Sequence, residues 1–294
     1  MNAPNPADRG NARRPAMGVS PHEANGDLHL AADAYANAIE SFRAACAELP
    51  EREVAERVRL LLRIARTEML RGRPADGLRV AREARSLARP LRDPSLMASV
   101  AAGLAILEIE HGAPRRGLRY ATWAHGVLGT LDAPERTASV ALAMGYALAR
   151  LGQPLRALEW LHDAAVTFRR LDHADGLVSA LTNLGLVHKN LREWREAIRH
   201  LEQALAIEER LGMFARMRGQ HQNLGLIRYR LGEWDAAEAH FQQSLRIARD
   251  LAHGVGEAGA RLALGLLARR RRNPEAAEAH YREAAAIATR AGAR

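Results

Sequence analysis

The chain has 294 residues, 48% of them hydrophobic, and a formal net charge of +9. It contains no apolar stretch of about 18 residues, so we expect no membrane association through a spanning helix. Its N-terminus lacks the apolar core of a secretory signal. The single cysteine, Cys46, cannot form an internal disulfide, which indicates a reducing compartment and predicts a cytoplasmic protein.

The basic residues are almost all arginine, since Lys189 is the only lysine. With the high alanine content, this bias is typical of a GC-rich bacterial genome. The alternative is a basic face selected to bind phosphate groups. Aromatic residues make up only 4% of the chain and are not arranged as stacking platforms, which argues against nucleic acid as the partner.

The first 50 residues divide into a tail and a helix. Residues 1–26 are rich in Pro, Asn, Gly and Ala without periodicity, so we expect a disordered tail. A helix is predicted from Asp27, a suitable N-cap, to Leu49, which precedes a proline. We interpret residues 27–50 as a helix that caps the N-terminal end of the repeats that follow. Its small and aromatic residues follow the spacing of a repeat helix, offset by one position: Ala38, Phe42 and Ala45.

Residues 51–292 repeat with a period of 40 residues. One residue in each repeat, here called the small position, is Ala65, Ala105, Gly145, Gly185, Gly225 and Gly265. A second small residue follows 12 residues later: Gly77, Gly117, Ala157, Ala197, Ala237 and Ala277. Another follows seven residues after that: Ala84, Ala124, Ala164, Ala204, Ser244 and Ala284. Between these two, the later repeats carry a large residue: Leu161, Leu201, Phe241 and Tyr281.

Each repeat is predicted to be two helices joined by a short turn, such as Gly152-Gln153-Pro154. The six repeats are expected near residues 52–93, 94–132, 133–172, 173–212, 213–252 and 253–291. Glycine inside a helix costs about 1 kcal/mol relative to alanine. Its recurrence at one phase therefore predicts that the first helix closely approaches a neighbour there.

These residues resemble the tetratricopeptide repeat, a helix-turn-helix solenoid unit, over roughly residues 56–292. The period exceeds the usual 34 residues by six and is similar to that of kinesin light chains, Pins-type adaptors and several bacterial regulators. The resemblance implies an all-α, right-handed superhelix of six repeats with an N-terminal capping helix. It also implies a non-catalytic scaffold for protein–protein interaction.

The sequence offers no catalytic or cofactor signature. It has no glycine-rich phosphate loop, no HExxH, no paired-cysteine motif and no nucleophile elbow, so we expect neither an enzyme nor a bound cofactor. His200, His240 and His280 share one phase of the repeat. Ligands to one metal ion must all lie within about 2.1 Å of it, which side chains one repeat apart cannot do. We therefore predict no metal site on this ladder.

The resemblance implies that the first helices of the repeats line a concave groove. Residues near the small position would then face a ligand. Those expected to do so are Tyr146, Arg150, Asn183, Leu186, Lys189, Asn190, Asn223, Leu226, Tyr229, Arg230, Leu266, Arg269 and Arg270.

Asn183 and Asn223 are the most specific candidates. In the 40-residue arrays that this chain resembles, asparagine in an Asn-Leu-Gly context binds the backbone of an extended peptide. An amide side chain both donates and accepts, so it can pair with a peptide group of any sequence. The alternative is that these amides bond the helix backbone or face water. The other repeats lack asparagine here, so any clamp is confined to repeats four and five.

The basic residues of this groove predict a protein or peptide partner of acidic character. The sequence ends after the second helix of repeat six without a polar capping helix. This end could be covered by a partner or by a second copy in a homodimer, could have been joined to the rest of a larger regulator, or could tolerate exposure. A sensor module, whose curvature responds to a peptide or small ligand, is the alternative function.

Overall fold

A computed structural model describes residues 20–31 and 34–290 of the chain. Its regular elements in these ranges are helical. The chain divides into two compact units, Met1–Leu107 and Glu108–Arg294. In the described residues no helix has the length and apolar character needed to cross a bilayer.

In its described residues the N-terminal unit contains four helices, a 3-10 turn and most of a fifth helix. In chain order they are α1 (Pro21–Ala31), α2 (Tyr35–Glu48), α3 (Val54–Leu70), α4 (Pro74–Ala88), the turn Arg89–Leu91 and α5 (Pro94–Glu110).

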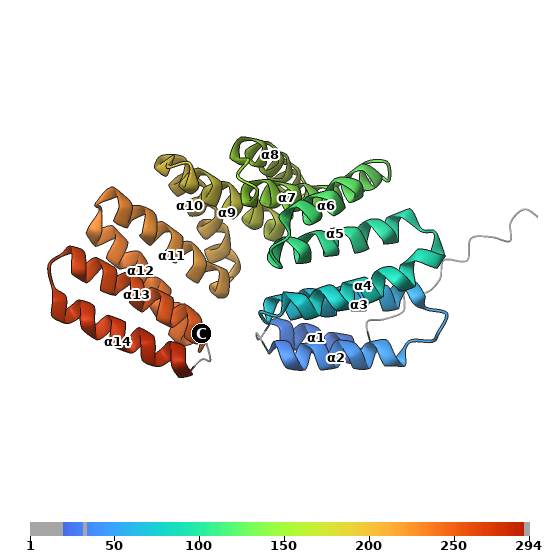
Figure 1. The fold of residues 1–294 in the computed structure, drawn as a ribbon, viewed down its shortest axis with the longest axis horizontal. Helices are drawn as coiled ribbons and strands as arrows, with labels where there is room; N and C mark the ends of the chain where they lie inside the picture. Colours follow the sequence, from blue (N-terminus) through green and yellow to red (C-terminus); the bar gives the residue numbers. More distant parts are fainter. Residues whose placement is uncertain (1–19, 32–33, 291–294) are drawn as a thin grey trace, which may run out of the picture. The chain divides into compact units, whose positions relative to one another are not determined.

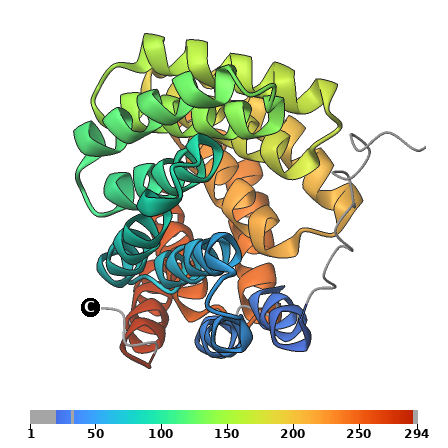
Figure 2. The same ribbon diagram turned by 90° about the vertical axis from the view of Figure 1, so that its right-hand side faces the viewer.

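The C-terminal unit continues with nine helices in its described residues. They are α6 (Pro114–Gly129), α7 (Pro134–Arg150), α8 (Pro154–Arg170), α9 (Ala174–Asn190), α10 (Trp194–Leu211), α11 (Phe214–Leu231), α12 (Trp234–Asp250), α13 (Gly254–Arg270) and α14 (Pro274–Arg290). Each packs against the next in the chain, and Figures 1 and 2 show them as successive antiparallel pairs. The predicted all-α, paired-helix architecture is therefore confirmed.

From α3 on, the helices are separated by turns that contain one left-handed residue every 20 positions. Proline begins many of the helices, where its missing N–H costs no hydrogen bond. The residues with positive φ are Gly72, Arg92, Gly112, Asp132, Gly152, Asp172, Arg192, Gly212, Gly232, Ala252 and Arg272. A left-handed residue after a helix lets the backbone N–H groups that follow reach the last carbonyls of that helix. The 40-residue period is thus two 20-residue helix-and-turn units.

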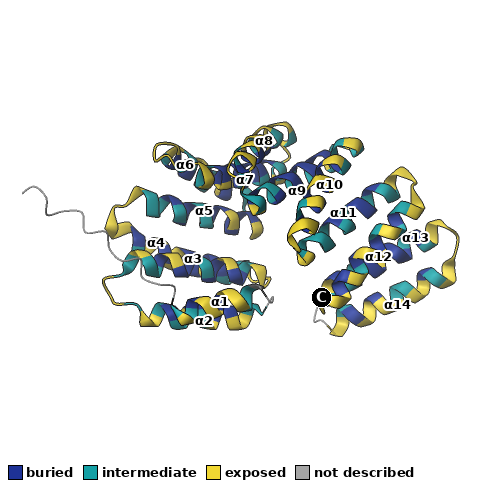
Figure 3. Ribbon diagram, turned by 180° about the vertical axis from the view of Figure 1, so that it is seen from behind, coloured by how far each residue is buried: buried dark blue, intermediate teal, exposed yellow. Residues whose placement is uncertain are grey.

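The small position receives a side chain from the second helix of its own repeat. A Cβ added to Gly145 would lie 2.6 Å from Leu161 Cγ, and one added to Gly185 would lie 2.7 Å from Leu201 Cγ. Both distances are shorter than any normal carbon contact, so only glycine fits. Leu161 and Leu201, which fill this space, are fully buried. Figure 3 shows buried, intermediate and exposed segments alternating along the helices. This is the close approach that the interior glycines predict.

The N-terminus differs from the prediction of one helix from Asp27 to Leu49. Helix α1 begins at Pro21, because the Ser20 hydroxyl accepts a hydrogen bond from the Glu23 backbone N–H at 3.1 Å and caps it. The end of the expected tail, residues 21–26, is therefore helical, while residues 1–19 lie outside the described residues.

Helices α1 and α2 form a pair of the same kind as the later repeats. A Cβ on Gly26 would lie 2.3 Å from the Phe42 ring, and these two residues are 16 apart, as are Gly225 and Phe241. Phe42 and Ala38 are fully buried. The segment expected to be a single capping helix is thus a complete helix pair with its own small position.

Candidate partner-binding face

The residues predicted to face a ligand lie on α7, α9, α11 and α13, the first helices of repeats three to six. We call their exposed and half-buried side the first-helix face. Leu186, Leu226 and Leu266 on it are half-buried. Lys189 is also half-buried. The other polar residues predicted at the ends of these helices are exposed: Arg150, Asn190, Arg230, Arg269 and Arg270.

A hydrogen bond joins this face between repeats four and five. Lys189 Nζ donates to Asn223 Oδ1 at 3.0 Å. Burial lowers the pKa of Lys189 below its usual value. Lys189 and Asn223 were both predicted for the site, and the structure brings them together.

Two tyrosines make the corresponding contacts elsewhere on the face. Arg270 Nε donates to Tyr229 Oη at 2.9 Å, which links repeats five and six. Tyr146 Oη donates to Glu110 Oε1 at 2.8 Å and accepts from Arg150 at 3.1 Å. Burial, and then the Glu110 carboxylate, raise the pKa of Tyr146. Side-chain contacts on this side of the first helices thus link repeat two to three, four to five and five to six.

The two asparagines are held by their own helices. Asn183 Nδ2 donates to the Ser179 carbonyl at 2.9 Å, and Asn223 Nδ2 donates to the Gly219 carbonyl at 3.1 Å. The alternative in which these amides bond helix backbone therefore holds for their nitrogen atoms. Asn223 also uses its oxygen, to accept from Lys189. Asn183 Oδ1 accepts no hydrogen bond from the part of the chain that the structure describes.

A buried polar cluster between repeats four and five was not predicted. Gln220 Nε2 on α11 donates to Thr182 Oγ1 on α9 at 2.6 Å and to Glu208 Oε1 on α10 at 3.1 Å. Glu208 is fully buried, and burial raises its pKa to about 7. It stands 40 residues after Phe168, which packs on Gly176. Because the repeat predicts an apolar residue there, this carboxyl was overlooked.

Two histidines of the 40-residue ladder, His200 and His240, contact other histidines. The His200 ring stacks on His188 with centroids 5.3 Å apart, and it lies 5.8 Å from the His162 ring. His240 Nδ1 is 3.0 Å from His221 Nδ1. The signal for the first contact is in the sequence, because His188 and His200 are each three residues beyond Gly185 and Ala197, which touch.

A family model described as tetratricopeptide repeat matches residues 136–210 and 213–290. Comparison with curated proteins gives no significant match.

Solved structures of similar fold cover most of the chain. A Rap protein complexed with Competence and Sporulation Factor has a TM-score of 0.69 and 15% identity, covering 89% of this chain and 82% of that one. BtubC from P. vanneervenii has a TM-score of 0.58 and 22% identity, covering 80% and 93%. A Signal Transduction ATPase with Numerous Domains from Pyrococcus horikoshii, with a tetratricopeptide repeat sensor, has a TM-score of 0.66 and 12% identity, covering 92% and 42%. At these identities the likeness concerns the fold.

Proposed function

We propose, because the chain belongs to the tetratricopeptide repeat family, that its first-helix face binds a peptide segment of a partner protein. The observation that carries this proposal is the set of contacts between neighbouring repeats along that face. Lys189 with Asn223 and Tyr229 with Arg270 make one polar surface that spans several repeats. A surface of this length suits a chain segment better than a compact small molecule.

The charge of the face favours an acidic segment. Arg230 and Arg269 are exposed and make no hydrogen bond or ion pair within the described residues, so both guanidinium groups are available to a ligand. Arginine binds carboxylates through two parallel hydrogen bonds. The half-buried Leu186 and Leu226 supply apolar contact beside these charges. An acidic peptide with interspersed apolar residues matches this arrangement.

Asn183 would contribute one hydrogen bond to such a peptide. Its Nδ2 is used by the helix, which leaves Oδ1 to accept from a peptide N–H. Asn223 would contribute only if Lys189 turned from it toward an acidic side chain. In this proposal the peptide backbone is held by one amide oxygen, Asn183 Oδ1, and Lys189 can exchange Asn223 for an acidic side chain of the peptide. The arginines then select for acidic residues.

The test is a capture experiment with charge-reversed variants. Wild type would be compared with an Arg230→Glu, Arg269→Glu variant and with a control, Arg195→Glu, Arg210→Glu, on α10. All four arginines are exposed and without partners in the described residues, so the variants match in charge and in lost contacts. After capture from a bacterial lysate, overlapping peptides of the captured protein would be measured by fluorescence anisotropy.

We expect one acidic peptide to bind wild type and the α10 control equally. It should bind the Arg230→Glu, Arg269→Glu variant at least about tenfold more weakly. Equal binding to all three proteins, or loss only in the α10 control, would place the site elsewhere. If only nucleic acid were captured, and moderate salt released it, the ligand would be a polyanion and not the proposed peptide.

A sensor function is the second candidate, because one protein of similar fold carries its repeats as a sensor. A peptide that bound the first-helix face would then also change the shape of the chain. Small-angle scattering with and without the captured peptide separates the two functions. A changed radius of gyration at saturation supports a sensor, and an unchanged one supports a scaffold.

A further inference from the structure

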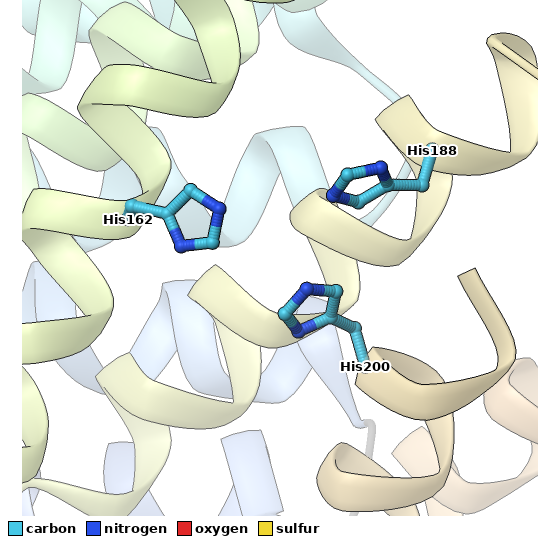
Figure 4. A group of neighbouring side chains, drawn as sticks. All are labelled: His162, His188 and His200. Atoms are coloured by element: carbon cyan, nitrogen blue, oxygen red, sulfur yellow. The ribbon is translucent and has the colours of Figure 1, made fainter. Parts of the chain in front are cut away.

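Three histidines from three consecutive helices point toward one space between repeats three and four. His162 lies on α8, His188 on α9 and His200 on α10, and Figure 4 shows their rings converging. One ring nitrogen from each lies within 4.8 Å of the other two. No other group of three metal-binding side chains meets this condition in the described part of the chain.

Of the ring nitrogens in this cluster, only His188 Nδ1 has a hydrogen-bond partner among the described residues. It lies 2.6 Å from Glu193 Oε2, and in the tautomer that donates this hydrogen bond Nε2 carries the lone pair. His188 Nε2 is buried without a hydrogen bond, and so are both ring nitrogens of His200. Buried polar atoms in native proteins almost always have a partner. These orphaned nitrogens therefore indicate a ligand.

Two charged side chains lie next to the cluster. Asp163 adjoins His162 in the sequence, and its carboxylate favours a cation there. Arg199 opposes a cation, but its guanidinium is paired with Glu196.

The next repeat shows what the same positions do with other residues. Forty residues on, Glu202 replaces His162, Arg228 replaces His188 and Glu233 replaces Glu193. Arg228 is 3.2 Å from Glu202 and 2.5 Å from Glu233, so an ion pair ties repeat four to repeat five. Between repeats three and four both partners are histidine. Two histidines cannot form an ion pair with each other, whereas a metal ion bound by both would join the two repeats.

We propose that His162, His188 and His200 bind a divalent transition-metal ion, with Zn²⁺ as the test ion, and that the ion ties repeat three to repeat four. Glu193 would orient His188 from behind, as carboxylates do for zinc-binding histidines. Three histidines leave a fourth position open to water or to a ligand. A pocket of about 390 Å³ beside His162 and His200 gives access to it.

To bind one ion, the three imidazole rings must move slightly closer together. Tetrahedral zinc with Zn–N distances near 2.1 Å holds its ligand nitrogens about 3.4 Å apart. The three nitrogens already lie within 4.8 Å, so the rings must close by about 1 Å. The His188 and His200 rings are inclined by only 13°, so one must turn about its Cβ–Cγ bond, a torsion with broad minima. His162 is exposed and can adjust.

The experiment measures binding of Co²⁺ and Zn²⁺ to the untagged full chain. Co²⁺ reports its own coordination, because tetrahedral complexes absorb strongly in the visible. We expect each chain to bind one Co²⁺ ion and to show the visible absorption bands of tetrahedral Co²⁺. Added Zn²⁺ should displace the Co²⁺ and remove these bands. His162→Ala, at an exposed position, should abolish the bands without affecting folding. The matched control, His221→Ala, lies in the two-histidine pair with His240 and should leave them unchanged.

A second pair of variants separates this site from adventitious binding. Glu193→Gln should weaken Zn²⁺ binding by about 10- to 100-fold, because the carboxylate no longer supports His188. Glu233→Gln, its equivalent one repeat later, should have no effect on the ion. Absence of tetrahedral Co²⁺ bands in wild type, or their persistence in His162→Ala, would overturn the proposal.

Discussion

Gly225 lies directly beneath the ring of Phe241. A Cβ on Gly225 would be 2.5 Å from Phe241 Cε1 and 2.6 Å from Cδ1. Phe241 is buried, so its ring cannot move away without displacing the neighbouring helices. The same relationship holds for Gly265 and Tyr281, at 2.5 Å. The small position is therefore a steric requirement of the helix pair.

We expect Gly225→Ala to destabilise the protein by about 1–3 kcal/mol, because the added methyl group overpacks this contact. Gly219 provides the control on the same helix, since no atom lies within 4 Å of its Cβ direction. Gly219→Ala should stabilise by up to about 1 kcal/mol through helix propensity alone. Urea unfolding of both variants checks the prediction, and a Gly225→Ala protein as stable as Gly219→Ala would contradict it.

The sequence was sufficient to predict the repeat, because glycine at one phase has a single steric cause. It was less informative at the N-terminus, where Gly26 and Phe42 keep the 16-residue spacing but are offset from the 40-residue register. The capping signal also lies upstream of the predicted start of the helix. Ser20 caps the helix, Pro21 and Glu23 follow it, and the predicted helix began only at Asp27.

The site was harder to predict, because each polar side chain on it can form more than one hydrogen bond, and only the structure shows which one forms. An asparagine such as Asn183 can bond its own helix or a ligand, and sequence does not rank these. The His162, His188 and His200 cluster does not follow the 40-residue period, so the repeat pattern gives no sign of it. Spacings of 12 and 38 residues also bring side chains together, across the turn and across the repeat.

Ala252→Gly should stabilise the protein. Ala252 has φ of 51°, a left-handed conformation that costs residues with a Cβ about 1–2 kcal/mol. Gly212 holds the equivalent turn position one repeat earlier at φ of 65°. We expect a gain of about 1 kcal/mol, offset in part by the greater freedom of glycine in the unfolded chain. Thermal unfolding measures it, and Gly212→Ala should show the opposite change.

Glu23→Gln should destabilise the N-terminal unit. The nearly buried Glu23 carboxylate accepts hydrogen bonds from Arg59 and Arg63 on α3, each at 2.6 Å. Burial alone would raise the pKa of Glu23, but the two arginines lower it below its usual value. Its contribution is therefore present above pH 4.5 and is lost as the pH falls through the folded-state pKa.

We expect a loss of about 1–3 kcal/mol at neutral pH for Glu23→Gln, the value typical of hydrogen bonds to a charged group. Faster amide exchange in α1 and α2 would report it. The exposed pair of Arg79 and Asp76 is the control, because Asp76→Asn should change stability by less than about 1 kcal/mol. Equal effects of the two substitutions would show that Glu23 does not hold α1 against α3.

Glu208 predicts a loss of stability as the pH rises from about 4.5 to 7, in the opposite direction to Glu23. Burial raises its pKa from 4.5 to about 7, so between these values the folded state binds a proton that the unfolded state has released. Folding then becomes less favourable as the pH rises from about 4.5 to 7, by at most about 1.4 kcal/mol per pH unit for one proton. Above pH 7 the folded state must hold a buried carboxylate, whose hydrogen-bond donor is Gln220.

Glu208→Gln removes that charge while keeping the shape of the side chain and an oxygen that can accept from Gln220. The variant should therefore be more stable than wild type at pH 8, and the difference should vanish near pH 4.5. Urea unfolding at several pH values measures this. Glu209→Gln, at the exposed neighbour, is the control, because it removes one carboxylate from the same helix without changing a buried side chain. If the Glu208→Gln and wild-type stabilities ran parallel with pH, the Glu208 carboxyl would not be carrying a proton near neutrality.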